Sequence, residues 1–313
     1  MQKRQDGLEV CCYLESLWQD IMIEEFLNYL RYERNRSELT VKNYDEDLKA
    51  FESYFKKLDK ELSWKSVDSD VIRGWMESMM DRGNIATSIN RRLSALRSLY
   101  RFALSKGYVV NDPVYRVVGP KRTKPLPQFL KEREMDEMLG ITVRKGGFKN
   151  VRAYTILIMF YETGVRLSEL VGFNDSSVDF VNRQLKVSGK RNKQRLIPFG
   201  EELAASLQMY LELRNESVDR KNDALFVTSE GERMNQDQVR YEVKKNLSKV
   251  CTLKKKTPHV LRHTFATAML NHDANIESVR QLLGHASVGT TEIYTHTTFE
   301  QLKRVYKNAH PRA

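Results

Sequence analysis

A proline-rich stretch at Gly119–Pro127 (GPKRTKPLP) places the strongest limit on how this chain can fold. Three prolines close together interrupt helices, because proline lacks a backbone N–H and its ring clashes with the preceding turn. The 313 residues also exceed the size at which one hydrophobic core usually stops growing. We therefore expect a linker at residues 119–127 between two domains, 21–118 and 128–313. Residues 1–20 have no clear periodicity and are expected to form an N-terminal tail.

Apolar residues before the linker recur at helical spacing in four segments. The first segment begins near Ile23, and Thr40 is the expected N-cap of the second. The stripes of the four segments are Phe26, Leu27 and Leu30; Tyr44, Leu48, Phe51 and Phe55; Val71, Trp75 and Met79; and Leu93, Leu96, Tyr100 and Ala103. Such stripes bury one face of each helix, so we predict a compact four-helix bundle.

The second domain combines helical patterns with short β-prone runs. Helices are expected over residues 131–143, 151–162, 201–214, 236–250, 259–271, 275–283 and 299–308. Strands are expected over residues 178–181, 184–187 and 195–199. Because the strands are short and successive, they favour a small antiparallel sheet. The predicted fold class is mainly α (α+β), with the N-terminal helical bundle followed by a mixed, mostly helical C-terminal domain.

An excess of basic residues favours a polyanionic partner. Lys and Arg number 52 against 41 Asp and Glu, which gives a formal net charge of +11. The fourth predicted helix carries a polar side suited to phosphates and base edges, formed by Ser88, Asn90, Arg91, Arg92, Arg97 and Arg101. A solvated arginine face explains the same residues, so DNA contact depends on independent support from the second domain.

The sequence contains neither a membrane-spanning pattern nor an export signal. Its longest apolar patches, such as Ile156–Phe160, fall far short of the roughly 18 residues that a membrane-spanning helix needs. Cys11, Cys12 and Cys251 have neither zinc-binding nor redox spacing. A reducing cytoplasm without disulfides is the expected location.

The segment Thr257–Ala266 (TPHVLRHTFA) carries two residues suited to binding an anion. A proline favours the start of a helix here, and His259 and Arg262 then lie three apart on one helix face. Both side chains can reach one anion, while Leu261 and Phe265 hold the opposing apolar face in position. An ion-pairing surface is the alternative for this segment taken alone.

Three other segments add candidate residues. The sequences LLGHAS and IYTH supply His285 and Tyr294. TGVRLSEL places Arg166 near the start of a short helix, where phosphate binding is favoured. VSGKRNKQRLIP would present Lys190 on a turn between two β-prone runs, although most such turns are merely solvated.

In order and spacing, these segments resemble the tyrosine recombinase family, also called the phage-integrase family. The resemblance spans about residues 21–310 and is strongest to the Xer-type site-specific recombinases. It implies active-site roles for Arg166, Lys190, His259, Arg262, His285 and the nucleophile Tyr294. One departure is Arg191, which follows Lys190 where relatives often carry Gly.

The resemblance implies cleavage and rejoining of DNA through a covalent 3′-phosphotyrosine. The guanidiniums of Arg166 and Arg262 would stabilise the negative charge that builds up on the attacked phosphate. His259 is the candidate general base, Lys190 is the candidate general acid, and His285 would orient phosphate or tyrosine. The covalent bond conserves the energy of the broken one, so we expect no ATP, metal or other cofactor. No GxxxxGK[ST] phosphate loop occurs.

The same resemblance implies an assembly of four protomers on two double-stranded DNA sites. The tetramer would be formed by this chain alone or with a related recombinase, and a DNA translocase is a further candidate partner. The expected role is resolution of chromosome or plasmid dimers, with integration or inversion by a phage or mobile element as the alternative. A C-terminal helix with Leu302, Val305 and Tyr306 would contact either a neighbouring protomer or its own core.

Two other classes of protein compete with this hypothesis. A metal-dependent hydrolase would use His259 and His263, four apart, with His285 as a third ligand. The helix lacks the Glu of an HExxH motif, and Arg262 would place positive charge beside the cation, so we expect His263 to be buried or to cap a helix. A non-catalytic DNA-binding protein would need only basic helices, and the complete set of catalytic residue types argues against it.

Overall fold

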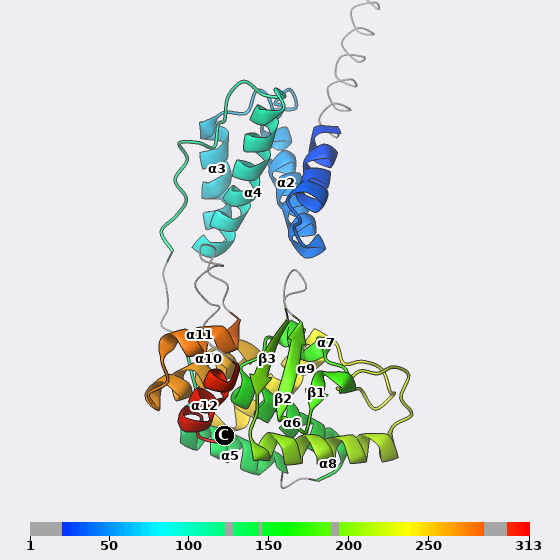
Figure 1. The fold of residues 1–313 in the computed structure, drawn as a ribbon. Coiled ribbons are helices and arrows are strands. Elements are labelled where there is room, and N and C mark those ends of the chain that lie inside the picture. Colours follow the sequence, from blue (N-terminus) through cyan, green and yellow to red (C-terminus); the bar gives the residue numbers. More distant parts are fainter. Residues whose placement is uncertain (1–20, 123–127, 144–145, 189–193, 285–298) are drawn as a thin grey trace, which may run out of the picture. The chain divides into compact units, whose positions relative to one another are not determined.

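The computed structural model describes residues 21–122, 128–143, 146–188, 194–284 and 299–313. The chain forms two compact units, Met1–Pro125 and Leu126–Ala313, whose ribbons are drawn in Figure 1. Within the described part of the chain, no helix combines the length and the apolar character needed to cross a membrane. Cys251 is a free, buried cysteine, whereas Cys11 and Cys12 lie outside the described residues.

The N-terminal unit has the four helical segments that the sequence predicts. Residues 21–28 are α-helical and continue into the π-helical turn η1 (Tyr29–Glu33). The other helices are α2 (Glu38–Leu58), α3 (Ser69–Asp81) and α4 (Ala86–Ser105). Their buried aromatic residues pack together, with the rings of Phe51 and Trp75 at a centroid distance of 4.8 Å.

The expected N-cap of α2 is wrong by three positions. Ser37 has an extended backbone, and its hydroxyl accepts a hydrogen bond from the Thr40 backbone N–H at 3.3 Å. The helix therefore begins before Thr40, because Ser37 already satisfies one of the free N–H groups of the first turn. In α3 the buried face is also shifted, since Ile72 is fully buried whereas Val71 is only partly buried.

The C-terminal unit is mostly helical. Its helices are α5 (Glu132–Val143), α6 (Phe148–Thr163), α7 (Leu167–Gly172), the 3-10 turn η2 (Asp175–Ser177), α8 (Glu201–Ser217), α9 (Gln236–Val250), α10 (Pro258–Asn271), α11 (Ile276–Leu283) and α12 (Phe299–Ala309). Helix α6 contacts α5, α8, α9 and α10, while α12 contacts α10 and α11. The predicted fold class, mainly α with a minor sheet, is confirmed.

The sheet of this unit has three antiparallel strands in the order β1-β2-β3. They are β1 (Val178–Asp179), β2 (Gln184–Ser188) and β3 (Gln194–Pro198). Leu185 pairs with Ile197, and Val187 pairs with Arg195. Leu185, Val187 and Ile197 are fully buried, so this face of the sheet is turned toward the core.

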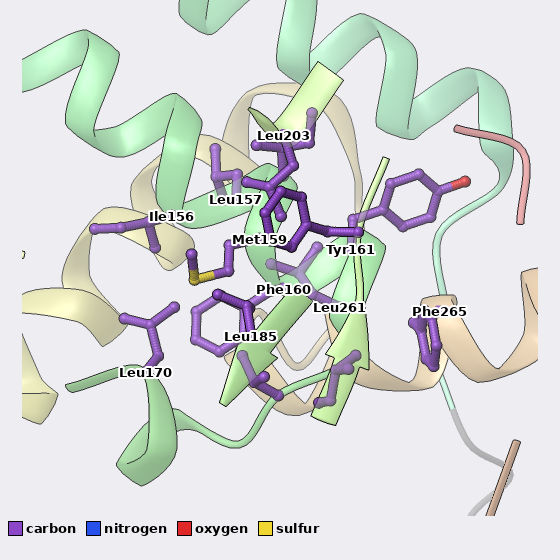
Figure 2. Packing of buried hydrophobic residues seen from close by; sticks show 14 of the residues in the cluster. Ile156, Leu157, Met159, Phe160, Tyr161, Leu170, Leu185, Leu203, Leu261 and Phe265 are labelled. Atoms are coloured by element: carbon purple, nitrogen blue, oxygen red, sulfur yellow. The ribbon is translucent and has the colours of Figure 1, made fainter. Parts of the chain in front are cut away.

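Helix α6 forms the centre of the core. Every residue from 155 to 163 is buried, as expected for a helix enclosed on all sides. Figure 2 shows its side chains packed with those of neighbouring elements, which include Leu170 of α7, Leu185 of β2, Leu203 of α8, and Leu261 and Phe265 of α10. Helix α6 therefore packs against α7, α8 and α10 in one core.

The apolar stripe of α12 packs on its own domain. Tyr306 is fully buried, and Leu302 and Val305 are partly buried against the same core cluster. The Tyr306 hydroxyl donates a hydrogen bond to the buried Glu162 carboxyl of α6 at 3.3 Å. Of the two roles considered for this stripe, the structure therefore shows the intramolecular one.

Candidate active site

Helix α6 ends at Gly164, a position that only glycine suits. Its φ of 58° is left-handed, and a Cβ there would lie 2.5 Å from Phe265 Cδ1 and 2.8 Å from Leu283 Cδ2. The glycine lets α10 and the end of α11 approach α6 closely. Its carbonyl accepts a hydrogen bond from Nη1 of Arg262, and the chain then turns into α7 through Arg166.

Arg166 is the N-cap residue of α7 and is held by two acceptors. Its guanidinium donates from Nη1 to Glu169 Oε1 at 2.9 Å and from Nη2 to the Gly284 carbonyl at 2.9 Å. Its backbone N–H donates to the other oxygen of Glu169 at 2.7 Å. The Arg166 side chain is still 37% exposed, so part of the guanidinium can face a ligand.

Arg262 lies in the first half of α10 and is buried. Besides Gly164, its guanidinium reaches the Leu283 carbonyl, to which Nη2 donates at 2.6 Å. Burial and the nearby charge of Arg166 lower the pKa of Arg262 to about 10, so the group stays cationic at neutral pH. The two arginines thus contact successive carbonyls, those of Leu283 and Gly284.

The C-terminal end of α11 gathers three arginines. The carbonyls of Leu282, Leu283 and Gly284 accept hydrogen bonds from Arg195, Arg262 and Arg166, respectively. Gly284 ends the helix with a left-handed φ of 63°. A helix C-terminus carries partial negative charge, which favours cations at this place.

Glu169 joins two of these arginines through one carboxylate. It accepts from Arg195 Nη1 at 2.8 Å and Nη2 at 2.9 Å, in addition to its bonds with Arg166. Burial alone would raise the pKa of Glu169, but the donors of Arg195 and Arg166 outweigh burial and hold it at about 2. Three guanidiniums against one carboxylate leave the cluster positively charged and suited to an anion.

Sequence reasoning overlooked Glu169 and Arg195. Glu169 stands three residues after Arg166, the spacing at which a glutamate can cap the N-terminus of a helix. Arg195 is the cross-strand partner of the fully buried Val187, so a charged residue occupies a core-facing strand position. Pairing the predicted strands as a hairpin would have placed Arg195 opposite Val187 and so indicated an inward-facing arginine.

His259 stands in the first turn of α10 near the arginines. The residue is exposed, yet desolvation by the surrounding protein, and then the positive charges of His263 and Arg262, lower its pKa below the ordinary value. The neutral imidazole, the form that can accept a proton, is therefore favoured at neutral pH. The expectation for His263 was wrong, because its side chain is exposed and lies on the α10 surface away from Leu261 and Phe265.

The structure thus brings together Arg166, His259 and Arg262. Lys190, His285 and Tyr294 lie outside the described residues. Among the residues that the structure does describe, no three His, Cys, Asp or Glu side chains group as ligands for a metal ion.

The polar residues predicted for DNA contact on α4 make several contacts within the N-terminal unit. Arg91 pairs with the buried Asp47, donating to Oδ1 at 2.8 Å, and Arg97 donates to the Val117 carbonyl at 2.8 Å. Asn90 donates to the Pro120 carbonyl at 2.8 Å and Arg92 to Asn84 at 3.2 Å. Arg101 is exposed and Ser88 is half-buried.

Comparison with known families gives matches to both units. Residues 128–301 match the phage integrase family, and residues 23–107 match the phage integrase N-terminal SAM-like domain. These ranges fall within the two units of the fold and include Arg166, His259 and Arg262.

Curated relatives match along nearly their whole length. Tyrosine recombinase XerC of Staphylococcus carnosus is 38% identical over 93% of this chain and 97% of its own. Tyrosine recombinase XerD of Oceanobacillus iheyensis is 35% identical over 93% of this chain and 98% of its own.

Solved structures show the same fold at lower identity. The Tn1549 transposon integrase in complex with a circular intermediate DNA superposes with a TM-score of 0.70 at 21% identity, covering 91% of this chain and 98% of the other. XerH site-specific recombinase bound to difH substrate gives a TM-score of 0.66 at 23% identity, covering 90% and 83%. Together with the family and relative matches, these likenesses establish that the chain belongs to the phage integrase family and is an Xer-type tyrosine recombinase, a site-specific DNA cleaving and rejoining enzyme.

Proposed function

We propose that this chain cuts DNA by forming a covalent 3′-phosphotyrosine, with Tyr294 as the nucleophile. The observation that carries the proposal is the arginine cluster. In it, Arg166 donates to the Gly284 carbonyl and Arg262 to the Leu283 carbonyl. Donors held in place before the reaction stabilise charge that develops in the transition state without a cost of reorganisation. A phosphodiester under attack by a tyrosine is a centre of this kind.

The proposed step balances as a transesterification. The Tyr294 oxygen bonds to phosphorus while the bond from phosphorus to the 5′ oxygen breaks. His259 takes the phenol proton, and Lys190 gives a proton to the departing 5′ oxygen. His285 orients the phosphate or the tyrosine. Attack by a 5′ hydroxyl reverses the step, so rejoining needs neither ATP nor a metal ion.

We further propose that the two units divide the work on DNA. Residues 21–118 would bind the recombination site through the polar side of α4, and residues 128–313 would carry the catalytic residues. Nη2 of Arg97 already donates to the Val117 carbonyl, whereas the exposed Arg101 is open to contact with a DNA phosphate. DNA affinity should fall with salt, with a slope of about −0.9 for each phosphate neutralised.

The proposed biological role is resolution of chromosome or plasmid dimers in the cytoplasm. Identities of 35% and 38% to XerD and XerC recombinases support this role over integration or inversion by a mobile element. The active species would be a tetramer on two DNA sites, formed by this chain alone or with a related recombinase. A DNA translocase is a candidate regulator.

The test begins with DNA captured covalently on the protein in its own cells, because sequencing that DNA identifies the site. A duplex of this site with a nick beside the cleavage position should trap the covalent complex. We expect Tyr294→Phe to abolish trapping while DNA binding stays within about twofold, since only the attacking oxygen is lost. Persistence of the adduct in Tyr294→Phe would show that another residue is the nucleophile.

The same trapping reaction tests the need for a metal ion. Adduct formation should be unchanged in EDTA and without ATP. Loss of activity in EDTA, restored by a divalent cation, would instead support the metal-dependent hydrolase.

A further inference from the structure

We infer that Arg195 is a positioning residue for the phosphate-binding arginines, acting through Glu169 and the C-terminal end of α11. This inference rests on the proposed function of Arg166 and Arg262. It concerns a residue of the sheet, outside the set of six that the family resemblance assigns.

The position of Arg195 on β3 turns its side chain inward. Arg195 pairs across the strands with Val187, which is fully buried. It also stands two residues before Ile197, which is fully buried as well and lies on the same face of the strand. The Arg195 side chain itself is only 17% exposed. A cation at a core-facing position has a large desolvation cost, so it requires acceptors that match its donors.

Each nitrogen of the Arg195 guanidinium has a protein acceptor. Nη1 and Nη2 donate to the two oxygens of Glu169 at 2.8 and 2.9 Å, and Nε donates to the Leu282 carbonyl at 3.1 Å. This bidentate geometry fixes the orientation of both partners. Because its three nitrogens are engaged within the domain and its side chain is only 17% exposed, we assign Arg195 a role that acts on the site through its neighbours.

Arg195 also determines how much of the charge of Arg166 is available. Glu169 accepts from both arginines, and its Oε1 is shared between Arg166 Nη1 at 2.9 Å and Arg195 Nη1 at 2.8 Å. Without Arg195, the buried carboxylate would have Arg166 as its main cation and would neutralise it. With Arg195 present, the carboxylate orients Arg166 while the cluster keeps its positive charge for phosphate.

A second contact places Arg195 against the backbone that holds Arg166. A Cβ added to Gly284 would lie 3.0 Å from Arg195 Cζ and 3.0 Å from its Nε. The Gly284 carbonyl is the acceptor of Arg166 Nη2. The single side chain of Arg195 therefore connects β3, α7 and the end of α11.

The experiment measures single-turnover cleavage of the nicked duplex by the full-length protein. We expect Arg195→Gln to reduce the cleavage rate by roughly tenfold to a hundredfold, because small displacements of catalytic groups have effects of this size. DNA affinity should stay within about twofold. Arg195→Lys, which keeps the charge but not the bidentate geometry, should fall between Arg195→Gln and the wild type.

Arg183→Gln is the matched control. Arg183 immediately precedes β2 and forms an exposed pair with Glu201 at 2.9 Å, away from Glu169. The same chemical change at this position should leave the cleavage rate and its pH dependence unchanged.

The pH profile separates positioning from a general loss of stability. Loss of Arg195 removes the main donor that opposes the effect of burial, so the pKa of Glu169 should rise from about 2. Cleavage by Arg195→Gln should then fail on the acid side at a higher pH than cleavage by the wild type. A carbon-13 NMR titration of the Glu169 carboxyl should show the same rise without DNA.

Two results would overturn the inference: a wild-type rate and pH profile in Arg195→Gln, or an unchanged Glu169 titration. If Arg195→Gln does not fold, the test uses Arg195→Lys instead. A wild-type cleavage rate and pH profile in Arg195→Lys would then contradict the positioning role of Arg195. Failure of the proposed function is distinguishable, because it would be seen as an adduct in Tyr294→Phe or no adduct in the wild type. The NMR titration tests Arg195 in either case.

Discussion

Arg262 is buried, and backbone carbonyls hold both terminal nitrogens of its guanidinium. The residue is 7% exposed, and its two terminal nitrogens donate to the carbonyls of Gly164 and Leu283. These two carbonyls lie at the C-terminal ends of different helices, α6 and α11. The orientation of the guanidinium therefore depends on how the helices pack, and it is set before any DNA binds.

Replacement of Arg262 by lysine should separate fixed geometry from charge. A single ammonium cannot reach both carbonyls and also present a fork to phosphate, so Arg262→Lys should lower single-turnover cleavage by roughly a hundredfold to a thousandfold. DNA affinity should change much less. Arg233→Lys is the control, because Arg233 donates to the carbonyls of Val171 at 2.8 Å and Phe173 at 3.0 Å, outside the cluster. Equal cleavage by Arg262→Lys and wild type would refute the assigned role.

At the residue scale, local spacing predicted some site residues and could not predict others. The TGVR and HxxR spacings singled out Arg166, His259 and Arg262, and the structure places the two arginines on successive carbonyls. Their catalytic roles stay predictions. The partners that hold them come from distant positions, as Arg195 reaches Glu169 across 26 residues. Arg91 likewise pairs with Asp47, 44 residues earlier, although helical periodicity alone suggested a free polar side chain.

The boundaries of helices depend on local chemistry, and they were predicted more completely than the partners of the site residues. Helices α9, α10, α11 and α12 each lie within one residue of the expected range, because apolar periodicity and glycine or proline signals agree there. Helix α6 starts three residues earlier than expected, at Phe148. The extra turn packs Phe148 against the core, which depends on tertiary contacts that periodicity does not contain.

The end of α6 provides a test at the scale of elements. Gly164→Ala adds a methyl group at a left-handed position that also lacks space, so we expect the free energy of unfolding to fall by about 1–3 kcal/mol. Cleavage should fall too, because the displaced Gly164 carbonyl no longer orients Arg262. Gly140→Ala is the control, since its added Cβ would meet no atom within 4 Å and should stabilise α5 by about 0.5–1 kcal/mol. Urea unfolding measures both, and equal stability of the two variants would contradict the packing argument.

The contact between α6 and α12 should make stability depend on pH. Burial raises the pKa of Glu162 to about 8, although Gly200 N–H and Tyr306 donate to its carboxyl. A glutamate in the unfolded chain has a pKa of about 4.3. Between that pH and about 8, Glu162 is therefore protonated in the folded protein and ionised in the unfolded chain. The stabilisation present at acid pH is therefore lost as pH rises toward 8, by at most about 1.4 kcal/mol per pH unit.

Glu162→Gln removes this titration. Urea unfolding of the wild type should show a decline in stability between pH 5.5 and about 8 that is smaller in Glu162→Gln. Identical pH dependence in the two proteins would show that Glu162 is not protonated in the folded state.

At the scale of the whole molecule, two compact units contribute separate properties. The C-terminal unit contains the arginine cluster, and the N-terminal unit contains the polar face of α4. Length and the proline-rich stretch predicted two domains from the sequence, and the chain forms two compact units. The linker bounds 119–127 stay a prediction. The net charge of +11 indicated a polyanionic partner but not the reaction, which required the motifs and the family match.

The central claim is that the cluster of Arg166 and Arg262 holds a DNA phosphate for attack by Tyr294. The most direct measurement is mass spectrometry of the trapped covalent complex after protease and nuclease digestion. Among the 14 tyrosines of the chain, we predict that only Tyr294 carries the nucleotide, attached through a 3′ phosphate. A nucleotide on any other residue, or one attached through its 5′ phosphate, would contradict the account.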